Sequence, residues 1–272
     1  MTKQQYFSQQ LDLECLGFDS FFRNQLPAHP ATLRPARVVR VAGARCDVLT
    51  AAGPCQVHLP RKHRSPPPVV GDWLTVDDDV GKPQATSRLM RKTQLVRAAA
   101  GKRTRAQVIA ANIDRVFVVM GLDGDFNPRR LERYLAMCAD AGIEVVVFLT
   151  KAQACPDVDT KVSTCRDVMP PGTALALHPI DVVAGLGRDL PLRYTPRGVT
   201  VALVGSSGAG KSTLVNHILN SEAAATGEVR AGDDRGRHTT THRELWCTPS
   251  GGIVIDNPGI RELGLWIEGD GL

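Results

Sequence analysis

The stretch Gly205-Ser206-Ser207-Gly208-Ala209-Gly210-Lys211-Ser212 matches the GxxxxGK[ST] phosphate-binding loop. The apolar run before it, residues 199–204, is typical of a buried strand, and the residues from Thr213 onward have the apolar spacing of a helix. A strand, a glycine-rich loop and a helix in this order form a cradle of backbone N–H groups around phosphate oxygens. The sequence therefore predicts a nucleotide site on an α/β fold.

Each part of the loop has a chemical role in such a site. Lys211 reaches the outer phosphates, and the Ser212 hydroxyl is a ligand for Mg²⁺. We therefore assign residues 205–213 to nucleotide binding and Lys211 also to catalysis. The alternative, a glycine-rich turn without a ligand, agrees less well with the flanking strand and helix.

The composition is that of an ordinary soluble, cytoplasmic protein. The 272 residues are 43% hydrophobic and 22% charged, residues 1–10 are polar, and no apolar stretch reaches 18 residues. The seven cysteines are an odd number without CxxC spacing, which favours free thiols in a reducing cytosol over disulfides or a zinc site. The net charge of +5 is concentrated in segments 61–64, 88–97, 102–105 and 235–243, which suit a polyanion; a solvated basic surface is the alternative for each.

The chain divides into three parts by pattern. Residues 1–32 are predicted to form an arm. Residues 33–98 contain short alternating runs separated by glycine and proline turns, which predict a small β-barrel of about five strands. After a linker near residues 98–106, residues 106–272 alternate apolar strands (116–120, 143–149, 173–177, 199–204 and 252–255) with helices, one of them capped by Asn127 and ending at Gly142. This predicts a mostly parallel sheet with flanking helices.

A second motif follows the last predicted strand. Asp256 opens a DxxG sequence in which the carboxylate can hold Mg²⁺ and Gly259 can donate its N–H to a γ-phosphate. Between the two motifs lies Gly236-Arg237-His238-Thr239-Thr240-Thr241, where Thr240 is expected to complete the Mg²⁺ shell. A polar loop or strand is the alternative for this threonine run.

A base-reading element must lie upstream, because only thirteen residues follow Gly259. The candidate is Thr150-Lys151-Ala152-Gln153, at the end of the strand predicted over residues 143–149. The order of the nucleotide motifs is then permuted relative to ordinary guanine-nucleotide switches.

This permuted order, behind a β-barrel, resembles the circularly permuted GTPases of the RsgA/YjeQ family, which assist maturation of the small ribosomal subunit. The similarity covers about residues 33–266 and includes segments 70–73, 111–115, 122–126, 129–134, the phosphate loop, 236–241 and 256–264. The resemblance implies an OB-type barrel before a permuted P-loop GTPase core. It also implies GTP and GDP as substrate and product, Mg²⁺ as cofactor, and the small subunit and its rRNA as partners. We expect a monomer without membrane attachment.

Three departures from the family bear on function. Gln153 stands where the family has the base-reading Asp, and Thr150 stands where it has Asn; Lys151 can still stack along the base. Pro179 lacks an N–H where a backbone contact is expected. The family's Cys/His module after the GTPase core does not follow this core, so no zinc is expected.

Catalysis requires a group that orients water. The residue after DxxG is Ile260, which cannot do so, and the resemblance suggests His238 instead, with a phosphate-contacting or solvated role as the alternative. We expect slow intrinsic turnover that a partner activates. The second hypothesis is an RNA-binding assembly factor with degraded guanine specificity and little turnover; a small-molecule kinase is the third.

Overall fold

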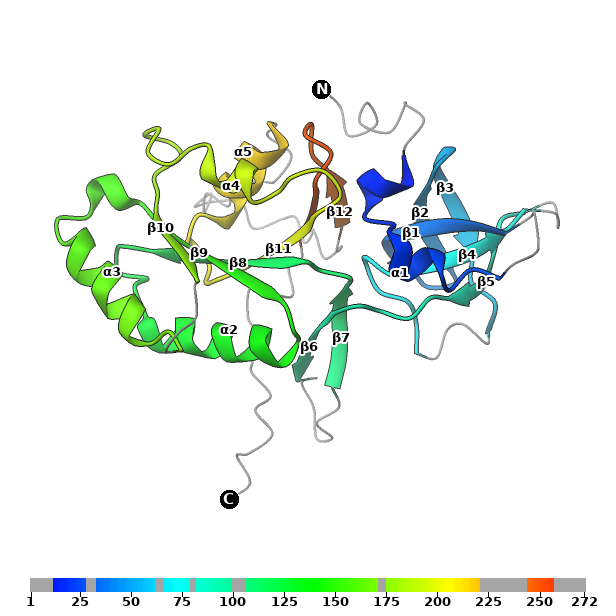
Figure 1. The fold of residues 1–272 in the computed structure, drawn as a ribbon, viewed down its shortest axis with the longest axis horizontal. Coiled ribbons are helices and arrows are strands. Elements are labelled where there is room, and N and C mark those ends of the chain that lie inside the picture. Colours follow the sequence, from blue (N-terminus) through cyan, green and yellow to red (C-terminus); the bar gives the residue numbers. More distant parts are fainter. Residues whose placement is uncertain are drawn as a thin grey trace, which may run out of the picture.

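A computed structural model describes residues 12–27, 33–61, 66–78, 82–98, 106–170, 175–220 and 244–256. Five of the strands close into a barrel in the order β1-β2-β3-β5-β4, seen at the right of Figure 1. They are β1 (Leu33–Ala42), β2 (Arg45–Thr50), β3 (Gly53–His58), β4 (Trp73–Asp77) and β5 (Gln84–Arg88). Alternate side chains such as Val38, Val48 and Val76 fill the barrel interior. The predicted small barrel is confirmed.

The second unit is a six-stranded sheet in the order β10-β9-β8-β11-β13-β12. Its strands are β8 (Arg115–Gly121), β9 (Glu144–Thr150), β10 (Ala176–Pro179), β11 (Thr200–Val204), β12 (Glu244–Cys247) and β13 (Ile253–Asp256). Neighbouring strands run parallel except β12, which pairs antiparallel with β13 at one edge. The mostly parallel sheet is therefore confirmed, and β12 is an element that the sequence patterns did not predict.

Helices cover both faces of this sheet. α2 (Pro128–Asp140) and α3 (Val158–Asp167) lie on one face, and α4 (Leu190–Arg193) and α5 (Lys211–Leu219) lie on the other (Figure 1). Successive residues of β8 point to opposite layers: Val116 and Val118 pack in the core under α2, whereas Phe117 and Val119 pack with α5. Burial on both faces explains why these strands are continuous apolar runs.

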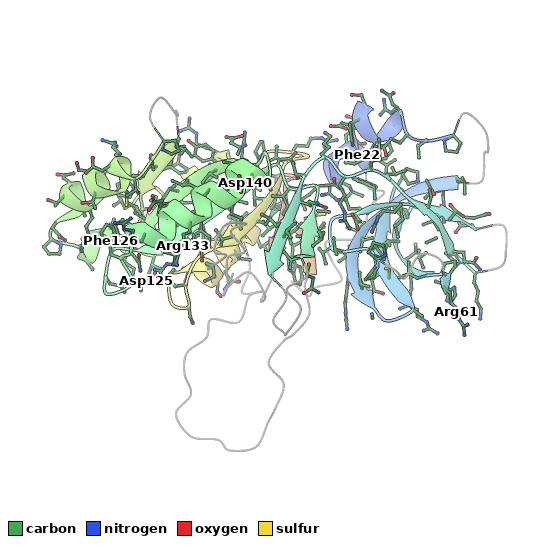
Figure 2. The ribbon with its side chains drawn as sticks, turned by 90° about the horizontal axis from the view of Figure 1, so that it is seen from below. Phe22, Arg61, Asp125, Phe126, Arg133 and Asp140 are labelled. Atoms are coloured by element: carbon green, nitrogen blue, oxygen red, sulfur yellow. The ribbon has the colours of Figure 1, made fainter. Side chains whose placement is uncertain are left out.

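The predicted cap of α2 is present. Asn127 Oδ1 accepts a hydrogen bond from Arg130 N at 3.0 Å, and Pro128 occupies the first turn, where it has no N–H to leave unpaired. The helix ends before Gly142, whose φ of +64° suits glycine. In Figure 2 the first turn of α2, near Phe126, points away from the barrel, and Asp140 at its other end lies nearer the barrel.

The N-terminal segment and a hairpin connect the barrel with the sheet. Within residues 12–27, η2 (Leu13–Leu16) and α1 (Ser20–Arg23) bury Leu16, Phe18 and Phe22, and the rings of Phe18 and Trp73 lie edge to face at 4.8 Å. β6 (Gln94–Ala98) and β7 (Ala106–Ala111) pair antiparallel on either side of the segment expected as a linker, of which residues 99–105 lie outside the described residues. The described part of the predicted arm is thus built into the core, while the domain boundaries at 32, 98 and 106 remain a prediction.

A buried arginine of the barrel, Arg37, forms hydrogen bonds that connect the barrel to the sheet. Arg37 of β1 donates from Nη2 to the carbonyl of Asn112 at 2.9 Å and to Thr200 Oγ1 at 3.1 Å, and from Nη1 to the carbonyl of Leu16. Its guanidinium lies 5.4 Å from the centre of the Trp73 ring. Burial lowers the pKa of Arg37 to about 10, so it is charged at neutral pH. Because Thr200 begins β11, one side chain connects the barrel with the strand that leads into the phosphate loop.

Candidate functional site

The phosphate loop lies where the sequence predicts it, between β11 and α5 at the carboxyl edge of the parallel sheet. Gly205 has φ +148°, and a Cβ there would lie 2.1 Å from the carbonyl oxygen of Val119 on β8. Only glycine therefore fits at the start of the loop. Gly208 and Gly210 also have positive φ, at +79° and +93°. This backbone turns the loop around the space before the first turn of α5, the arrangement of an anion cradle.

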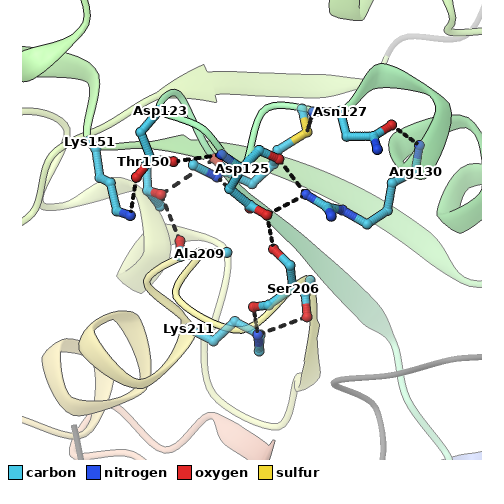
Figure 3. A network of polar contacts seen from close by, with 12 residues as sticks. Asp123, Asp125, Asn127, Arg130, Thr150, Lys151, Ser206, Ala209 and Lys211 are labelled. Carbon is cyan, nitrogen blue, oxygen red and sulfur yellow. Dashed lines mark hydrogen bonds and ion pairs between the residues drawn. The ribbon is translucent and has the colours of Figure 1, made fainter. Parts of the chain in front are cut away.

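Lys211 folds back over this loop. Its Nζ donates to the carbonyl of Gly205 at 2.8 Å and to the carbonyl of Ser206, as Figure 3 shows. These bonds hold the ammonium of this half-buried side chain against the first two residues of the loop. Such a placement gives outer phosphate oxygens a positive charge next to the backbone donors.

The predicted magnesium ligands come from neighbouring elements. Ser212 and Thr213 are half-buried in the first turn of α5. Asp256 ends β13, which pairs with β11. A hydroxyl from one element and a carboxylate-bearing residue from the next are oxygen donors of the kind that Mg²⁺ takes. The residues present therefore fit the ion.

Thr150 joins the candidate base-reading element to the phosphate loop. It ends β9, is buried, and donates from Oγ1 to the carbonyl of Ala209 at 2.7 Å. Lys151 follows with the left-handed φ of +62°, and its Nζ lies 2.5 Å from Asp123 Oδ2. Gln153 is exposed on the single turn η4 (Ala152–Ala154). The structure thus brings Thr150, the first residue of this element, against the phosphate loop although 59 positions separate it from Ala209 in the chain.

A loop that carries no predicted site residue completes this network. Between β8 and α2, Asp125 Oδ1 accepts from Ser206 Oγ and from Arg130 Nη2, the latter at 2.6 Å. Asp125 Oδ2 accepts from Gly121 N at 3.3 Å. The sequence signal for this loop is the family resemblance of segments 122–126 and 129–134, which by itself indicates no role for Asp125.

The backbone N–H groups at the end of β10 and just beyond it are not free to contact a nucleotide base. Pro179 has no N–H, Ile180 N donates to the carbonyl of Leu149 at 2.8 Å, and Asp181 N donates to that of Leu186 at 2.9 Å. Proline is tolerated here because β10 is an edge strand. The donors of residues 180 and 181 are therefore already used, consistent with the expected loss of a base contact at this position.

Comparison with known proteins shows the family to which this chain belongs. The model of the family described as RsgA GTPase matches residues 88–266. The chain belongs to the RsgA GTPase family. Among its relatives, the small ribosomal subunit biogenesis GTPase RsgA of Xylella fastidiosa strain M12 is 47% identical over 243 residues, which cover 85% of this chain and 70% of the relative. The small ribosomal subunit biogenesis GTPase RsgA 2 of Vibrio parahaemolyticus serotype O3:K6 is 42% identical over 259 residues, 93% of this chain and 69% of the relative.

Solved structures agree on the fold of this RsgA-family chain. The crystal structure of YjeQ from Thermotoga maritima superposes with a TM-score of 0.64 at 22% identity, over 86% of this chain and 77% of that one. YloQ, a circularly permuted GTPase, gives a TM-score of 0.59 at 17% identity, over 88% and 75%. The predicted permuted GTPase core behind a β-barrel is therefore confirmed.

Several predicted site residues of this RsgA-family chain lie outside the described residues: His238, Thr240 and Gly259, together with Ile260 and the basic segment 235–243. The backbone of Asp256 is described. The catalytic and metal-binding roles of these residues remain predictions. Within the described ranges, no helix is long and apolar enough to cross a membrane.

One predicted basic segment has a structural role. Arg91 donates to both carboxylate oxygens of buried Asp72, from Nε at 2.7 Å and from Nη2 at 2.8 Å, and Lys92 pairs with Asp19. Arg88 lies 4.0 Å from Asp72. Arg88, Arg91 and Lys92 are thus placed next to two carboxylates, Asp72 and Asp19, so this segment is a weaker candidate for a polyanion surface than its sequence indicates.

Proposed function

We propose that this chain hydrolyses GTP to GDP and assists late maturation of the small ribosomal subunit. One observation carries the proposal: Thr150, at the end of β9, is hydrogen-bonded to Ala209 of the phosphate loop, which supports a permuted order in which the candidate base-reading element lies upstream of the phosphate loop. Membership of the RsgA GTPase family and relatives named small ribosomal subunit biogenesis GTPases support it.

The proposed roles follow from position in the site. Residues 205–213 hold the phosphates, with Lys211 at the outer ones, while Thr150 and Lys151 support the base side and Gln153 faces the base edge. Ser212, Asp256 and Thr240 are proposed as protein ligands of Mg²⁺, which when bound neutralises charge on the β- and γ-phosphates. Gly259 is proposed to donate its N–H to the γ-phosphate.

The chemical step is proposed to depend on a partner. Ile260 has no polar group with which to orient water, and His238 is the proposed substitute. Contact with the small subunit would order the segment 236–241 around the γ-phosphate. Intrinsic turnover is then slow, and the ribosomal particle supplies the activation.

The barrel is proposed to bind rRNA through its backbone and shape. Trp73, the single aromatic residue of segment 33–97, is fully buried against Phe18 and Arg37, so it cannot act as a stacking platform for bases. Exposed basic residues such as Arg61, at the far end of the barrel in Figure 2, suit phosphate contacts. We further propose a cytoplasmic monomer.

A second function has its own support. Gln153 in place of a carboxylate, and paired backbone donors at Ile180 and Asp181, weaken guanine recognition and favour an RNA-binding assembly factor with little turnover. Calorimetric titration with GTP, GDP and ATP, with and without Mg²⁺, separates the two functions. The GTPase proposal expects Mg²⁺-dependent GTP binding that Ser212→Ala weakens more in the presence of Mg²⁺ than in its absence. Absence of nucleotide binding in the unaltered protein would leave only the assembly-factor function.

A further inference from the structure

The loop at residues 122–127 lies between the two halves of the candidate nucleotide site. It follows β8, which is the strand between β9 and β11 in the sheet. Lys151 follows β9 and the phosphate loop follows β11. Because parallel strands end at the same edge of a sheet, the loop after β8 lies beside both, and Figure 3 shows its two aspartates, Asp123 and Asp125, between Lys151 and Ser206.

The first aspartate engages the base side. Asp123 Oδ2 accepts from Lys151 Nζ at 2.5 Å, and this hydrogen bond lowers the pKa of the Asp123 carboxyl. Asp123 Oδ1 accepts from Asp125 N at 3.1 Å, which fixes the carboxylate within the loop. Lys151 is held in a left-handed backbone conformation directly after β9. The ion pair therefore restricts where the lysine stem can lie.

The second aspartate engages the phosphate side. Asp125 shares Oδ1 between Ser206 Oγ and Arg130 Nη2, and its side chain is only 17% exposed. Arg130 also donates to the Asp125 carbonyl and belongs to α2, which Asn127 caps. Ser206 is the second residue of the phosphate loop. Asp125 thereby connects the Ser206 hydroxyl of the phosphate loop to Arg130 of α2, a helix packed on the sheet.

We propose that these carboxylates are positioning residues with separate tasks: Asp123 orients Lys151 along the face of the nucleotide base, and Asp125 holds the phosphate loop in its binding shape through Ser206. This inference rests on the proposed function, since it requires a guanine nucleotide in the site. Rigid preorganisation of a loop reduces the ordering cost of binding. Lys151 can then contact the face of the base ring, and this contact does not depend on hydrogen bonds from Gln153 to the edge of the base.

Double-mutant cycles on GDP binding test the two tasks separately, with full-length protein and calorimetric titration. Asp123→Asn should weaken GDP about threefold, as expected for an exposed ion pair. Asp125→Asn should weaken it about tenfold or more, because a mostly buried carboxylate with charge-assisted bonds is lost. The double variant Asp123→Asn/Lys151→Ala should lose no more GDP affinity than Lys151→Ala alone. The double variant Asp125→Asn/Ser206→Ala should lose no more GDP affinity than Asp125→Asn alone.

The cross pairs supply the decisive comparison. Asp123→Asn combined with Ser206→Ala should weaken GDP by the product of the single effects, because the two tasks are separate. Asp123→Asn should also weaken ADP by the same factor as GDP, since the lysine stem covers a ring face common to both purines. Asp140→Asn, an exposed change at the other end of α2, serves as the matched control and should leave GDP binding unchanged.

Thermal unfolding without nucleotide separates positioning from stability. The variants should keep unfolding midpoints close to that of the Asp140→Asn control while GDP affinity falls. Multiplicative effects within the pairs, or losses of affinity that merely follow losses of stability, would overturn this inference and leave the GTPase proposal intact. Failure of the unaltered protein to bind GDP would overturn the proposed function and this inference with it.

Discussion

The hydroxyl of Thr150 donates to the carbonyl oxygen of Ala209 at 2.7 Å, and this one bond joins the end of β9 to the phosphate loop. A Cβ placed on Gly210 would lie 3.5 Å from the Thr150 side chain, so the loop rests directly against it. Thr150 stands where relatives of the RsgA type were expected to have Asn. The Thr150 hydroxyl thus links the candidate base-reading element to the phosphate loop.

Replacing this hydroxyl should weaken nucleotide binding. Thr150→Val keeps the branched shape but leaves the buried Ala209 carbonyl without its donor, which costs about 1 to 3 kcal/mol. We expect GDP affinity to fall about tenfold, and Thr150→Ser to retain most of it. Calorimetric titration measures both; equal affinity of the valine and serine variants would show that the bond does not shape the loop.

The exposed glutamine of η4 gives a prediction on base choice. Gln153 offers one acceptor and one donor where a carboxylate offers two acceptors to the guanine edge, so discrimination between GTP and ATP should be poor. Gln153→Asp should tighten GTP about tenfold or more, because hydrogen bonds to a charged group contribute about 1.5 to 3 kcal/mol. ATP affinity should stay equal or fall. A strong native GTP preference that the substitution leaves unchanged would place the base-reading contact elsewhere.

The buried arginine at the junction should contribute strongly to stability. Arg37→Met removes the donor of two carbonyls and of the Thr200 hydroxyl, and we expect a loss of about 3 kcal/mol or more in the free energy of unfolding. Thermal unfolding followed by circular dichroism measures the loss. Arg45→Met, at an exposed position on β2, is the control and should change the midpoint little. Similar unfolding midpoints for both variants would show that the hydrogen bonds of Arg37 do not stabilise the junction between barrel and sheet.

The reactivity of the cysteine thiols should fall as their burial increases. Burial raises the pKa of Cys46 and Cys138 to about 12 and that of Cys165 to about 11. At pH 8 the thiolate fraction of Cys138 is then on the order of one in ten thousand, and the thiolate is the reactive species. Iodoacetamide should therefore spare these three cysteines in the folded protein and modify them after denaturation, as peptide mass spectrometry reports. Rapid modification of Cys138 in the folded state would contradict the burial of the face of α2 that carries this residue.

Local patterns predicted those elements whose signal lies in neighbouring residues. The buried runs of β8 and β9, the Asn127 cap and the phosphate loop each have a signature within about ten positions, and each is found where expected. β12 was missed because four residues at an antiparallel edge carry too little periodicity. The hairpin of β6 and β7 was missed because its strands flank a basic, glycine-containing segment.

The remaining features depend on contacts between distant segments. Arg37 lies among the alternating residues of a strand, where no local pattern marks a buried charge. Its partners Asn112 and Thr200 are 75 and 163 positions away in the chain. Asp123 and Asp125 likewise follow β8 with no local sign of a positioning role, because their partners Lys151 and Ser206 follow the neighbouring strands β9 and β11. Such roles follow from sheet order, which a single sequence does not contain.

GTP turnover by the unaltered protein and by Lys211→Ala, each measured with and without small ribosomal subunits, tests whether this chain is a GTPase that the subunit activates. Lys211 Nζ is hydrogen-bonded to the carbonyl of Gly205 in the phosphate loop, and its removal would take away the positive charge proposed to contact the outer phosphates. We expect subunits to accelerate turnover by the unaltered protein at least tenfold, about 1.4 kcal/mol of barrier, and we expect no measurable turnover by Lys211→Ala in either condition. Equal turnover by the two proteins in the presence of subunits would contradict the GTPase proposal.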